Sequence, residues 1–316
     1  MRIAVMGAGA IGGYFGAKLA LSGQEVHFIA RGKHLDELQR SGLRVESVDG
    51  DFAVAPGPGG VLATADPAAV GPVDIVMFCV KSYDTEVAAE QLAPMIGPST
   101  GVISLQNGID NEEKLVARLG PDHVMGGVAF IFAQRSGPGV IRHTGGARRI
   151  VFGELDGTSS TRASAFLEAC QRAGFPAEIS PDIRAALWSK FAFICAQAGL
   201  TAAVRLSIGE IRDAPESWAL FRRVVDEALA VARAEGIDLP ADQADRLVAM
   251  AAGLEADGRS SLHDDLVAGR RMELDALLGE LVRRGRLHAI DVSASEALVA
   301  ILRPWQKRNE PPVIDP

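Results

Sequence analysis

Short apolar runs alternate with amphipathic segments through the first half of the chain, a pattern typical of strands and helices in alternation. The predicted strands are residues 3–6, 25–30, 74–80, 101–105, 124–133, 149–153 and 177–180. Predicted helices between them cover residues 14–22, 86–95 and 161–173. This alternation predicts a doubly wound parallel sheet, the Rossmann-type α/β architecture.

The pattern changes after Ser180. Ser180 followed by Pro181 is a helix-start signal, because proline is well tolerated at the first helical position. Helical periodicity then continues through residues 183–203, 218–236, 241–257, 262–284 and 293–307, without a strand signal. We therefore expect an α/β domain over residues 1–180 and an all-helical domain over residues 181–316.

A glycine-rich turn joins the first predicted strand to the first predicted helix. Such a turn brings backbone N–H groups and a helix N-terminus against a pyrophosphate. The chain has 34 glycines, so the pattern alone is weak evidence, but its place between a strand and a helix is the context of a dinucleotide site. The residues expected to bind the cofactor here are Gly7, Ala8, Gly9, Ala10, Ile11 and Gly12.

A basic residue stands where a dinucleotide site usually has an acidic one. Arg31 follows the last glycine of the turn by 19 residues, at the end of the second predicted strand. A carboxylate there would hold the free 2′-hydroxyl of NAD, whereas an arginine suits the 2′-phosphate of NADP. We therefore expect NADPH (NADP⁺) as the cofactor. The alternative is that Arg31 is a solvated residue of a basic turn that includes Lys33 and His34.

Composition narrows the class of protein. A net charge of −8 argues against nucleic-acid binding, and no apolar stretch approaches a membrane span. The chain starts directly in a predicted strand, so we expect a cytoplasmic protein. The three cysteines, Cys79, Cys170 and Cys195, lie at unrelated spacings in apolar surroundings, so we expect no disulfide framework and no metal site.

Two polar residues follow predicted strands at the edge where parallel sheets bind ligands. Lys81 could face the adenosine or ribose side of the cofactor, and Asn107 could hydrogen-bond its ribose near the nicotinamide. For Lys81 the alternative is a solvated lysine at the start of a loop. For Asn107 it is a simple Asn-Gly turn with Gly108.

Lys190 lies in a predicted helix whose apolar residues surround most of its circumference. Desolvation disfavours the ammonium and lowers the pKa of a lysine, which suits a general acid that protonates a developing alkoxide. The alternative is a lysine whose stem is buried and whose head reaches water.

Glu273 is predicted to project from an apolar stripe that it shares with Leu266 and Leu277. It could orient Lys190 or accept a hydrogen bond from a substrate hydroxyl, and the alternative is an ion pair with Arg270. Ser261 could donate to a substrate carboxylate or simply cap the helix, with Asp264 completing a capping box. We expect His143 to be a surface residue in a turn-rich segment that has no adjacent carboxylate.

These motifs together resemble the ketopantoate reductases. The resemblance covers nearly the whole chain, from the glycine turn and Arg31 through Lys81, Asn107 and the Leu-Trp-x-Lys segment to the segments around Ser261 and Glu273. It implies NADPH-dependent reduction of 2-dehydropantoate to (R)-pantoate, a step toward coenzyme A. It also implies that Lys190 is the general acid, that Glu273 and Ser261 hold the substrate, and that the chain forms a homodimer.

The sequence departs from that family beside the lysine. The family usually has asparagines four and eight residues after it, where this chain has Ile194 and Ala198; Gln197 is adjacent to the second. Loss of two hydrogen-bonding groups should alter substrate preference. One alternative is therefore a D-2-hydroxyacid dehydrogenase of the same fold that acts on a more apolar keto acid and uses NAD(H). An alternative of another class is a non-catalytic sensor that binds NADPH.

Overall fold

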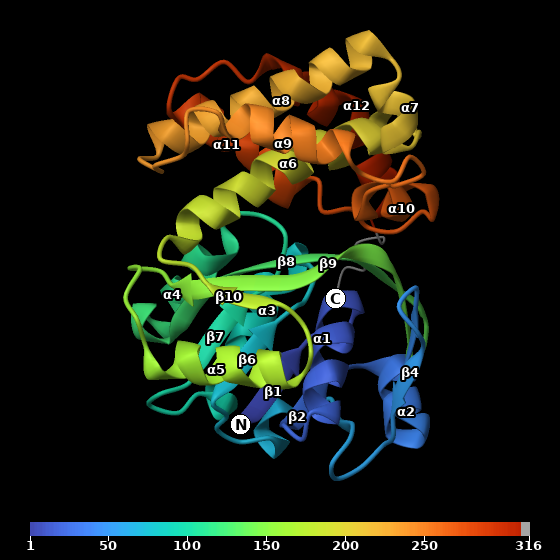
Figure 1. Ribbon diagram of the computed structural model, residues 1–316, viewed down its shortest axis with the longest axis vertical. Helices are drawn as coiled ribbons and strands as arrows, with labels where there is room; N and C mark the ends of the chain where they lie inside the picture. Colours follow the sequence, from blue (N-terminus) through green and yellow to red (C-terminus); the bar gives the residue numbers. More distant parts are fainter. Residues whose placement is uncertain (311–316) are drawn as a thin grey trace, which may run out of the picture. The chain divides into compact units, whose positions relative to one another are not determined.

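The computed structural model describes residues 1–310, which form two compact units. The first comprises Met1–Gln106 and Asn111–Ile183. The second begins with the short segment Asn107–Asp110 and continues from Arg184 onward. Figure 1 shows a sheet with helices in the first unit and helices alone in the second.

A ten-stranded mixed sheet forms the first unit, in the order β4-β3-β9-β8-β7-β6-β1-β2-β5, with β10 paired to β9. The strands are β1 (Arg2–Met6), β2 (Glu25–Ile29), β3 (Leu43–Ser47), β4 (Phe52–Val54), β5 (Leu62–Thr64), β6 (Ile75–Phe78), β7 (Gly101–Ser104), β8 (Val124–Gly137), β9 (Val140–Glu154) and β10 (Ala177–Ile179). The helices of this unit are α1 (Ala10–Leu21), α2 (Gly32–Ser41), α3 (Thr85–Glu90), α4 (Asn111–Leu119) and α5 (Thr161–Arg172).

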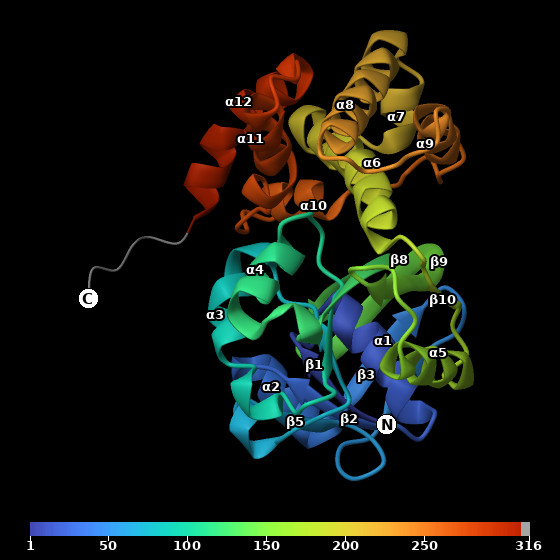
Figure 2. The same ribbon diagram turned by 90° about the vertical axis from the view of Figure 1, so that its left-hand side faces the viewer.

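Helices cover both faces of this sheet, as Figure 2 shows. Strand β1 illustrates why its sequence is a continuous apolar run. Ile3 and Val5 pack in the cluster that contains residues of α1 and α5, and Ala4 and Met6 pack in the cluster that contains residues of α3 and α4. A strand buried on both faces has no polar side to alternate with its apolar one. The predicted fold class is confirmed: a doubly wound α/β sheet followed by a helical region.

The predicted segments 124–133 and 149–153 are not separate parallel strands but the starting and finishing parts of one long antiparallel hairpin. Strands β8 and β9 are 14 and 15 residues long and turn at Pro138 and Gly139. Gly139 has a φ of +67°, a conformation that glycine adopts without strain. The outer half of the hairpin is mostly exposed and polar, so it has no apolar signal from which the sequence could predict strands.

The second unit is helical throughout its described part. Its elements are α6 (Ile183–Val204), α7 (Ile208–Arg212), α8 (Pro215–Ala234), α9 (Gln243–Ala252), α10 (Ser261–Val267), the π-helical turn η5 (Asp275–Gly279), α11 (Glu280–Leu287) and α12 (Ser293–Asn309). Residues on most sides of α6 are buried in one core, among them Trp188, Phe191 and Cys195. Ile109 packs in the same core, which explains why Asn107–Asp110 belongs to this unit.

Helix α6 is long and apolar enough to cross a membrane by length and composition alone, contrary to the expectation that no stretch approaches such a span. Its most apolar window has a mean hydropathy of 1.3, and 67% of that window is buried inside the protein. This degree of burial is typical of the central helix of a core.

The helix predicted over residues 262–284 is interrupted. Helix α10 ends in a glycine cap: Gly269 has a φ of +65°, its N–H donates to the Leu266 carbonyl at 3.1 Å, and the Arg270 N–H donates to the Asp265 carbonyl at 2.8 Å. A connecting segment then leads to η5, whose Gly279 N–H donates to the carbonyl of Leu274, five residues earlier, at 2.9 Å. Glu273 therefore lies between two helices, and the predicted stripe that it shares with residues of α10 is wrong.

Candidate active site

The predicted site residues fall into two groups, and the first, which lies in the first unit apart from Asn107, is centred on the glycine-rich turn after β1. Gly7 has a φ of +99°, and a Cβ there would lie 2.8 Å from the Val80 nitrogen. A Cβ on Gly12 would collide with the Gly7 carbonyl oxygen and lie 2.5 Å from Val5 Cγ1. Both glycines are thus required by the packing of the turn, the helix and the strand.

Gly9 is different, because a Cβ at this position would meet no atom within 4 Å. Its small size is not needed by the protein's own packing, and it leaves room for a ligand to approach the backbone. Gly9 is also the N-cap of α1, where no side chain caps the helix and no acidic residue lies in the first turn. The first N–H groups of α1 are therefore available to an anion, so the turn fits a dinucleotide pyrophosphate.

Arg31 lies two residues after the end of β2 and is the N-cap of α2. Its side chain is exposed, and its Nη2 donates to Gln91 Oε1 at 3.0 Å. A guanidinium has five N–H donors in a planar fork, so this contact leaves most of them open to a ligand. An exposed arginine at the end of β2 fits a 2′-phosphate.

Lys81 and Asn107 follow β6 and β7, as predicted from the sequence. Lys81 is half-buried and comes directly after Val80, the residue whose backbone contacts Gly7. Gln106, which the sequence did not single out, joins the two strand ends: its Nε2 donates to the Val80 carbonyl at 3.0 Å and to Thr85 Oγ1 at 2.8 Å. Asn107 comes directly after this buried amide in the chain.

The second group is built around Lys190 on α6. Lys190 is half-buried, and burial lowers the pKa of its ammonium to about 8, while the negative charge of Glu273 acts in the opposite direction. Glu273 itself is buried, with 8% of its surface exposed. The structure thus brings Lys190 and Glu273 together. Arg270, the alternative ion-pair partner of Glu273, donates through its Nε to Asp265 Oδ1 at 2.7 Å.

The cap of α10 is Ser260 and not Ser261. Ser260 Oγ accepts a hydrogen bond from the His263 N–H at 3.1 Å, and Ser261 is the first helical residue, with an exposed side chain. The Ser260 hydroxyl also lies 2.7 Å from Thr201 Oγ1 on α6. This contact fixes the N-terminus of α10, and with it Ser261, against the helix that carries Lys190.

Ile194 and Ala198 lie on the same helix as Lys190, four and eight residues after it. Ile194 is half-buried and Ala198 is buried, with 2% of its surface exposed. Gln197 is also buried, at 4% exposed, and its Nε2 has no hydrogen-bond partner among residues 1–310. Since seven residues make about two helical turns, Gln197 shares a face of α6 with Lys190.

His143 is not a surface residue, as the sequence had suggested, but is 2% exposed on β9. Its Nδ1 lies 2.8 Å from Ser47 Oγ, and its Nε2 lies 3.0 Å from the Gly145 carbonyl oxygen. A carboxylate is also near, because Asp49 Oδ2 is 3.7 Å from Nδ1. Burial lowers the pKa of His143. Both ring nitrogens are engaged within the sheet, so the residue has a structural role.

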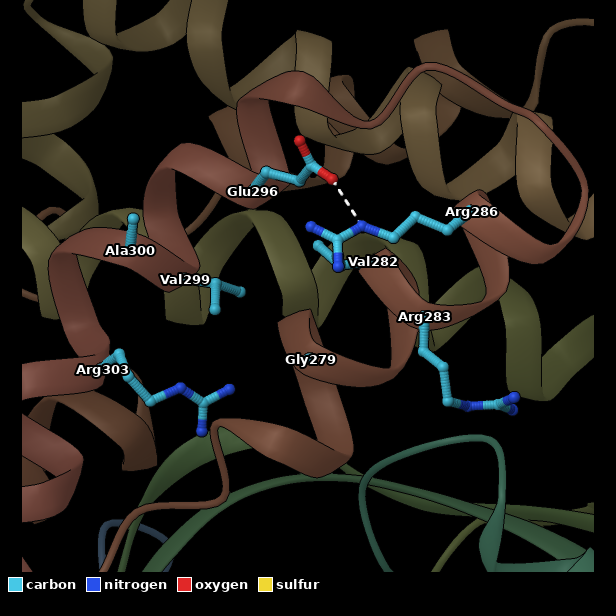
Figure 3. Close-up of a pocket in the computed structure, with 8 residues that line it drawn as sticks. All are labelled: Gly279, Val282, Arg283, Arg286, Glu296, Val299, Ala300 and Arg303. Atoms are coloured by element: carbon cyan, nitrogen blue, oxygen red, sulfur yellow. Dashed lines mark hydrogen bonds and ion pairs between the residues drawn. The ribbon is translucent and has the colours of Figure 1, made fainter.

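A pocket of about 520 Å³ between α11 and α12 contains none of the predicted residues (Figure 3). Its three arginines each pair with a carboxylate: Arg286 with Glu296 at 2.8 Å, Arg283 with Glu280 at 2.6 Å, and Arg303 with Asp275 at 2.6 Å. These pairs neutralise the arginines, and Glu296, the carboxylate among the lining residues, is itself held in an ion pair with Arg286.

Two family models match the chain. The model described as "Ketopantoate reductase PanE/ApbA" matches residues 3–157, and the model described as "Ketopantoate reductase PanE/ApbA C terminal" matches residues 182–306. The 2-dehydropantoate 2-reductase of Archaeoglobus fulgidus is 35% identical, over 96% of this chain and 97% of that protein.

Solved structures agree with these matches. The PanE/ApbA family ketopantoate reductase from Ralstonia eutropha has a TM-score of 0.88 and 37% identity, over 98% of this chain and 99% of that one. D-mandelate dehydrogenase in complex with NADH and anilino(oxo)acetate has a TM-score of 0.87 but only 21% identity, over 98% of this chain and 99% of that one. The second likeness extends to the fold alone.

Proposed function

Because the chain belongs to the ketopantoate reductase family, and is therefore an oxidoreductase that acts on a 2-keto acid, we propose that it uses NADPH to reduce 2-dehydropantoate to (R)-pantoate. The reaction would serve pantothenate and coenzyme A biosynthesis, in a cytoplasmic homodimer. The observation that carries the proposal is the half-buried Lys190 near the buried Glu273, with a lysine pKa of about 8.

Two features of the first unit support NADPH as the cofactor. The open space at Gly9 and the uncapped N-terminus of α1 suit the pyrophosphate, and the exposed Arg31 guanidinium suits the 2′-phosphate. Lys81 and Asn107 would line the same cofactor site. When bound, the cofactor would supply a hydride to the carbonyl carbon of the keto acid.

The second unit would supply the proton. The Lys190 ammonium would donate a proton to the carbonyl oxygen as negative charge develops there, and its pKa of about 8 keeps it mostly protonated at neutral pH while making it a better acid than a solvated lysine. Glu273 would stabilise the ammonium and accept a hydrogen bond from a substrate hydroxyl. Ser261, at the exposed first position of α10, would donate to the substrate carboxylate.

We expect Arg31→Ala to raise the KM for NADPH by about tenfold or more, since a hydrogen bond to a charged group contributes about 1.5–3 kcal/mol. The KM for NADH should be unchanged, because NADH has no 2′-phosphate. Steady-state kinetics with both cofactors measure this. Lys33→Ala, which removes an exposed positive charge two residues away, is the matched control. Equal changes for NADPH and NADH would contradict the assignment of Arg31.

A second substrate class deserves a direct comparison, because Ile194 and Ala198 replace the family's asparagines with apolar side chains. A D-2-hydroxyacid dehydrogenase acting on a more apolar keto acid would suit that surface. A panel of keto acids, assayed by NADPH and NADH oxidation, separates the two. Oxidation of neither cofactor with any keto acid would overturn the proposed function.

Introducing asparagine at positions 194 and 198 tests whether these positions determine the preference between the two substrate classes. We expect the double variant Ile194→Asn, Ala198→Asn to raise the preference for 2-dehydropantoate over trimethylpyruvate by about tenfold, because each added hydrogen bond contributes about 0.5–1.5 kcal/mol. Trimethylpyruvate is a suitable competitor, since it lacks only the hydroxyl group. Ile194→Leu, which stays apolar, is the control, and the ratio of the two kcat/KM values is the measurement. An unchanged ratio would show that these positions do not contact the hydroxyl group.

A further inference from the structure

His34 has both ring nitrogens engaged within the first unit, although it is only the third residue of α2. The side chain is buried, with 6% exposed. Its Nδ1 lies 3.0 Å from the Gly139 N–H, and its Nε2 lies 2.7 Å from the Ala8 carbonyl oxygen. A backbone N–H can only donate, so Nδ1 is an acceptor and carries no proton. The ring is therefore neutral, and its Nε2–H donates to Ala8.

The contact with Ala8 determines which way the next amide points. The Ala8 carbonyl and the Gly9 N–H belong to one planar trans peptide, in which the two groups point in opposite directions. Fixing the carbonyl toward His34 therefore directs the Gly9 N–H to the opposite side. The Ala8 N–H is held as well, by the Ile29 carbonyl at 3.3 Å. The conformation of the turn is thus set on both sides of Ala8.

On this basis, and resting on the proposed function, we propose that His34 is a positioning residue for the cofactor: it orients the Gly9 N–H toward the pyrophosphate. Arg31, the residue proposed for the 2′-phosphate, is the N-cap of α2, and His34 follows it by three residues in the first turn of this helix. The two phosphate contacts of the cofactor are thereby held in a fixed spacing. His34 need not touch the cofactor to have this effect.

The contact with Gly139 fixes the histidine itself. Gly139 lies at the turn between β8 and β9, and its carbonyl accepts a hydrogen bond from the Arg44 N–H of β3 at 2.9 Å. The hairpin turn is therefore anchored independently of His34. Protonation of Nδ1 would place its N–H opposite the Gly139 N–H, so that two donors would face each other without an acceptor. Burial, together with the positive charge of Arg135 on β8, lowers the pKa of His34 and keeps the ring neutral.

Three substitutions separate the two hydrogen bonds. The amide nitrogen of glutamine reaches as far as Nε2, so His34→Gln retains the donor to Ala8 and loses the acceptor for Gly139. The amide oxygen of asparagine takes the place of Nδ1, so His34→Asn retains the acceptor and loses the donor. His34→Leu loses both. The measurements are the Kd for NADP⁺ by calorimetry and the Tm of the free protein.

We expect His34→Asn and His34→Leu to bind NADP⁺ about tenfold more weakly, and His34→Gln to stay within about threefold of wild type. The Tm should fall in both single-bond variants, because each loses one hydrogen bond. In steady-state assays the KM for NADPH should rise in His34→Asn, with kcat and the KM for the keto acid unchanged. A structural role alone would make affinity follow Tm in all the variants.

The pH dependence of binding gives a second readout. As the pH falls through the lowered pKa of His34, below its usual value of about 6.5, protonation should weaken NADP⁺ binding in wild type. The 2′-phosphate titrates near pH ~6 as well, but equally for every variant, so His34→Gln is the reference. The loss of NADP⁺ affinity at acidic pH should be smaller in His34→Gln than in wild type.

Wild-type affinity in His34→Asn, or affinities that follow Tm in all three variants, would overturn the inference while leaving the proposed function intact. A wild-type protein that binds neither NADP⁺ nor NADPH would overturn both.

Discussion

Replacing Lys190 with methionine will lower kcat for keto acid reduction by about 10²–10⁴-fold, the usual contribution of a general acid. Methionine fills a similar volume without a proton to give, so the helix should keep its packing. The affinity for NADPH should stay near the wild-type value, since Lys190 is on α6 whereas the glycine turn and Arg31 are in the first unit. NADPH oxidation gives the rate, and NADPH fluorescence gives the affinity.

Ser189→Ala is the matched control for damage to α6, because this neighbour only donates to the Ala185 carbonyl of its own helix, at 2.8 Å. It should retain nearly full activity. A Lys190→Met variant with turnover within about tenfold of wild type would remove Lys190 from the role of general acid.

The same lysine predicts the form of the pH profile. A general acid acts in its protonated state, so kcat/KM should be level below the pKa of Lys190, which is about 8, and fall as the pH rises above it. For a solvated lysine this fall would begin near pH ~10.4. A profile that stays level up to that higher pH would contradict the low pKa.

Replacing Glu273 with glutamine is expected to lower kcat/KM by about 10- to 150-fold, because a hydrogen bond to a charged group contributes about 1.5–3 kcal/mol. A second effect separates this variant from a merely misfolded one. The charge of Glu273 raises the pKa of Lys190, so its removal should lower that pKa further. The alkaline fall in kcat/KM should then begin at a lower pH than in wild type.

Glu273→Asp keeps the charge with a shorter side chain and is the control. It should retain the wild-type position of the alkaline fall even if its activity is reduced. An unchanged pH profile in Glu273→Gln would show that Glu273 does not act on Lys190.

The elements predicted correctly from the sequence are those whose burial produces a plain apolar pattern along the chain. Strand β1 is apolar throughout because helices cover both of its faces, and the glycines after it are required by close packing. Strands β3, β4 and β5 and helix α2 were not predicted. The three strands are only five, three and three residues long, and β3 pairs with the distant strand β9. Helix α2 is mostly polar and exposed, so its sequence resembles a surface loop.

Some residues of the candidate site can be recognised in the sequence, whereas others cannot. Lys190 and Arg31 stand out in the sequence because each differs in charge from the residue expected at its position. The glycine turn stands out because it lies between a strand and a helix. His34 does not, since a histidine in a basic segment looks like part of a solvated surface. Its partners, Ala8 and Gly139, are 26 and 105 residues away along the chain. Only the folded structure shows that this side chain connects them.

The position of Glu273 depends on the number of residues in the π-helical turn before α11, and not only on which residues they are. A π turn contains one residue more than the α-helical turn it replaces. Asp275 anchors it to α12, through Gln306 and Arg303, each at 2.6 Å. Loss of one residue would restore regular helix and rotate whatever precedes it by about 100°. Glu273 lies just before this turn. A relative that lacks the extra residue would therefore place a different residue at the position of this glutamate, even if every neighbouring residue were identical.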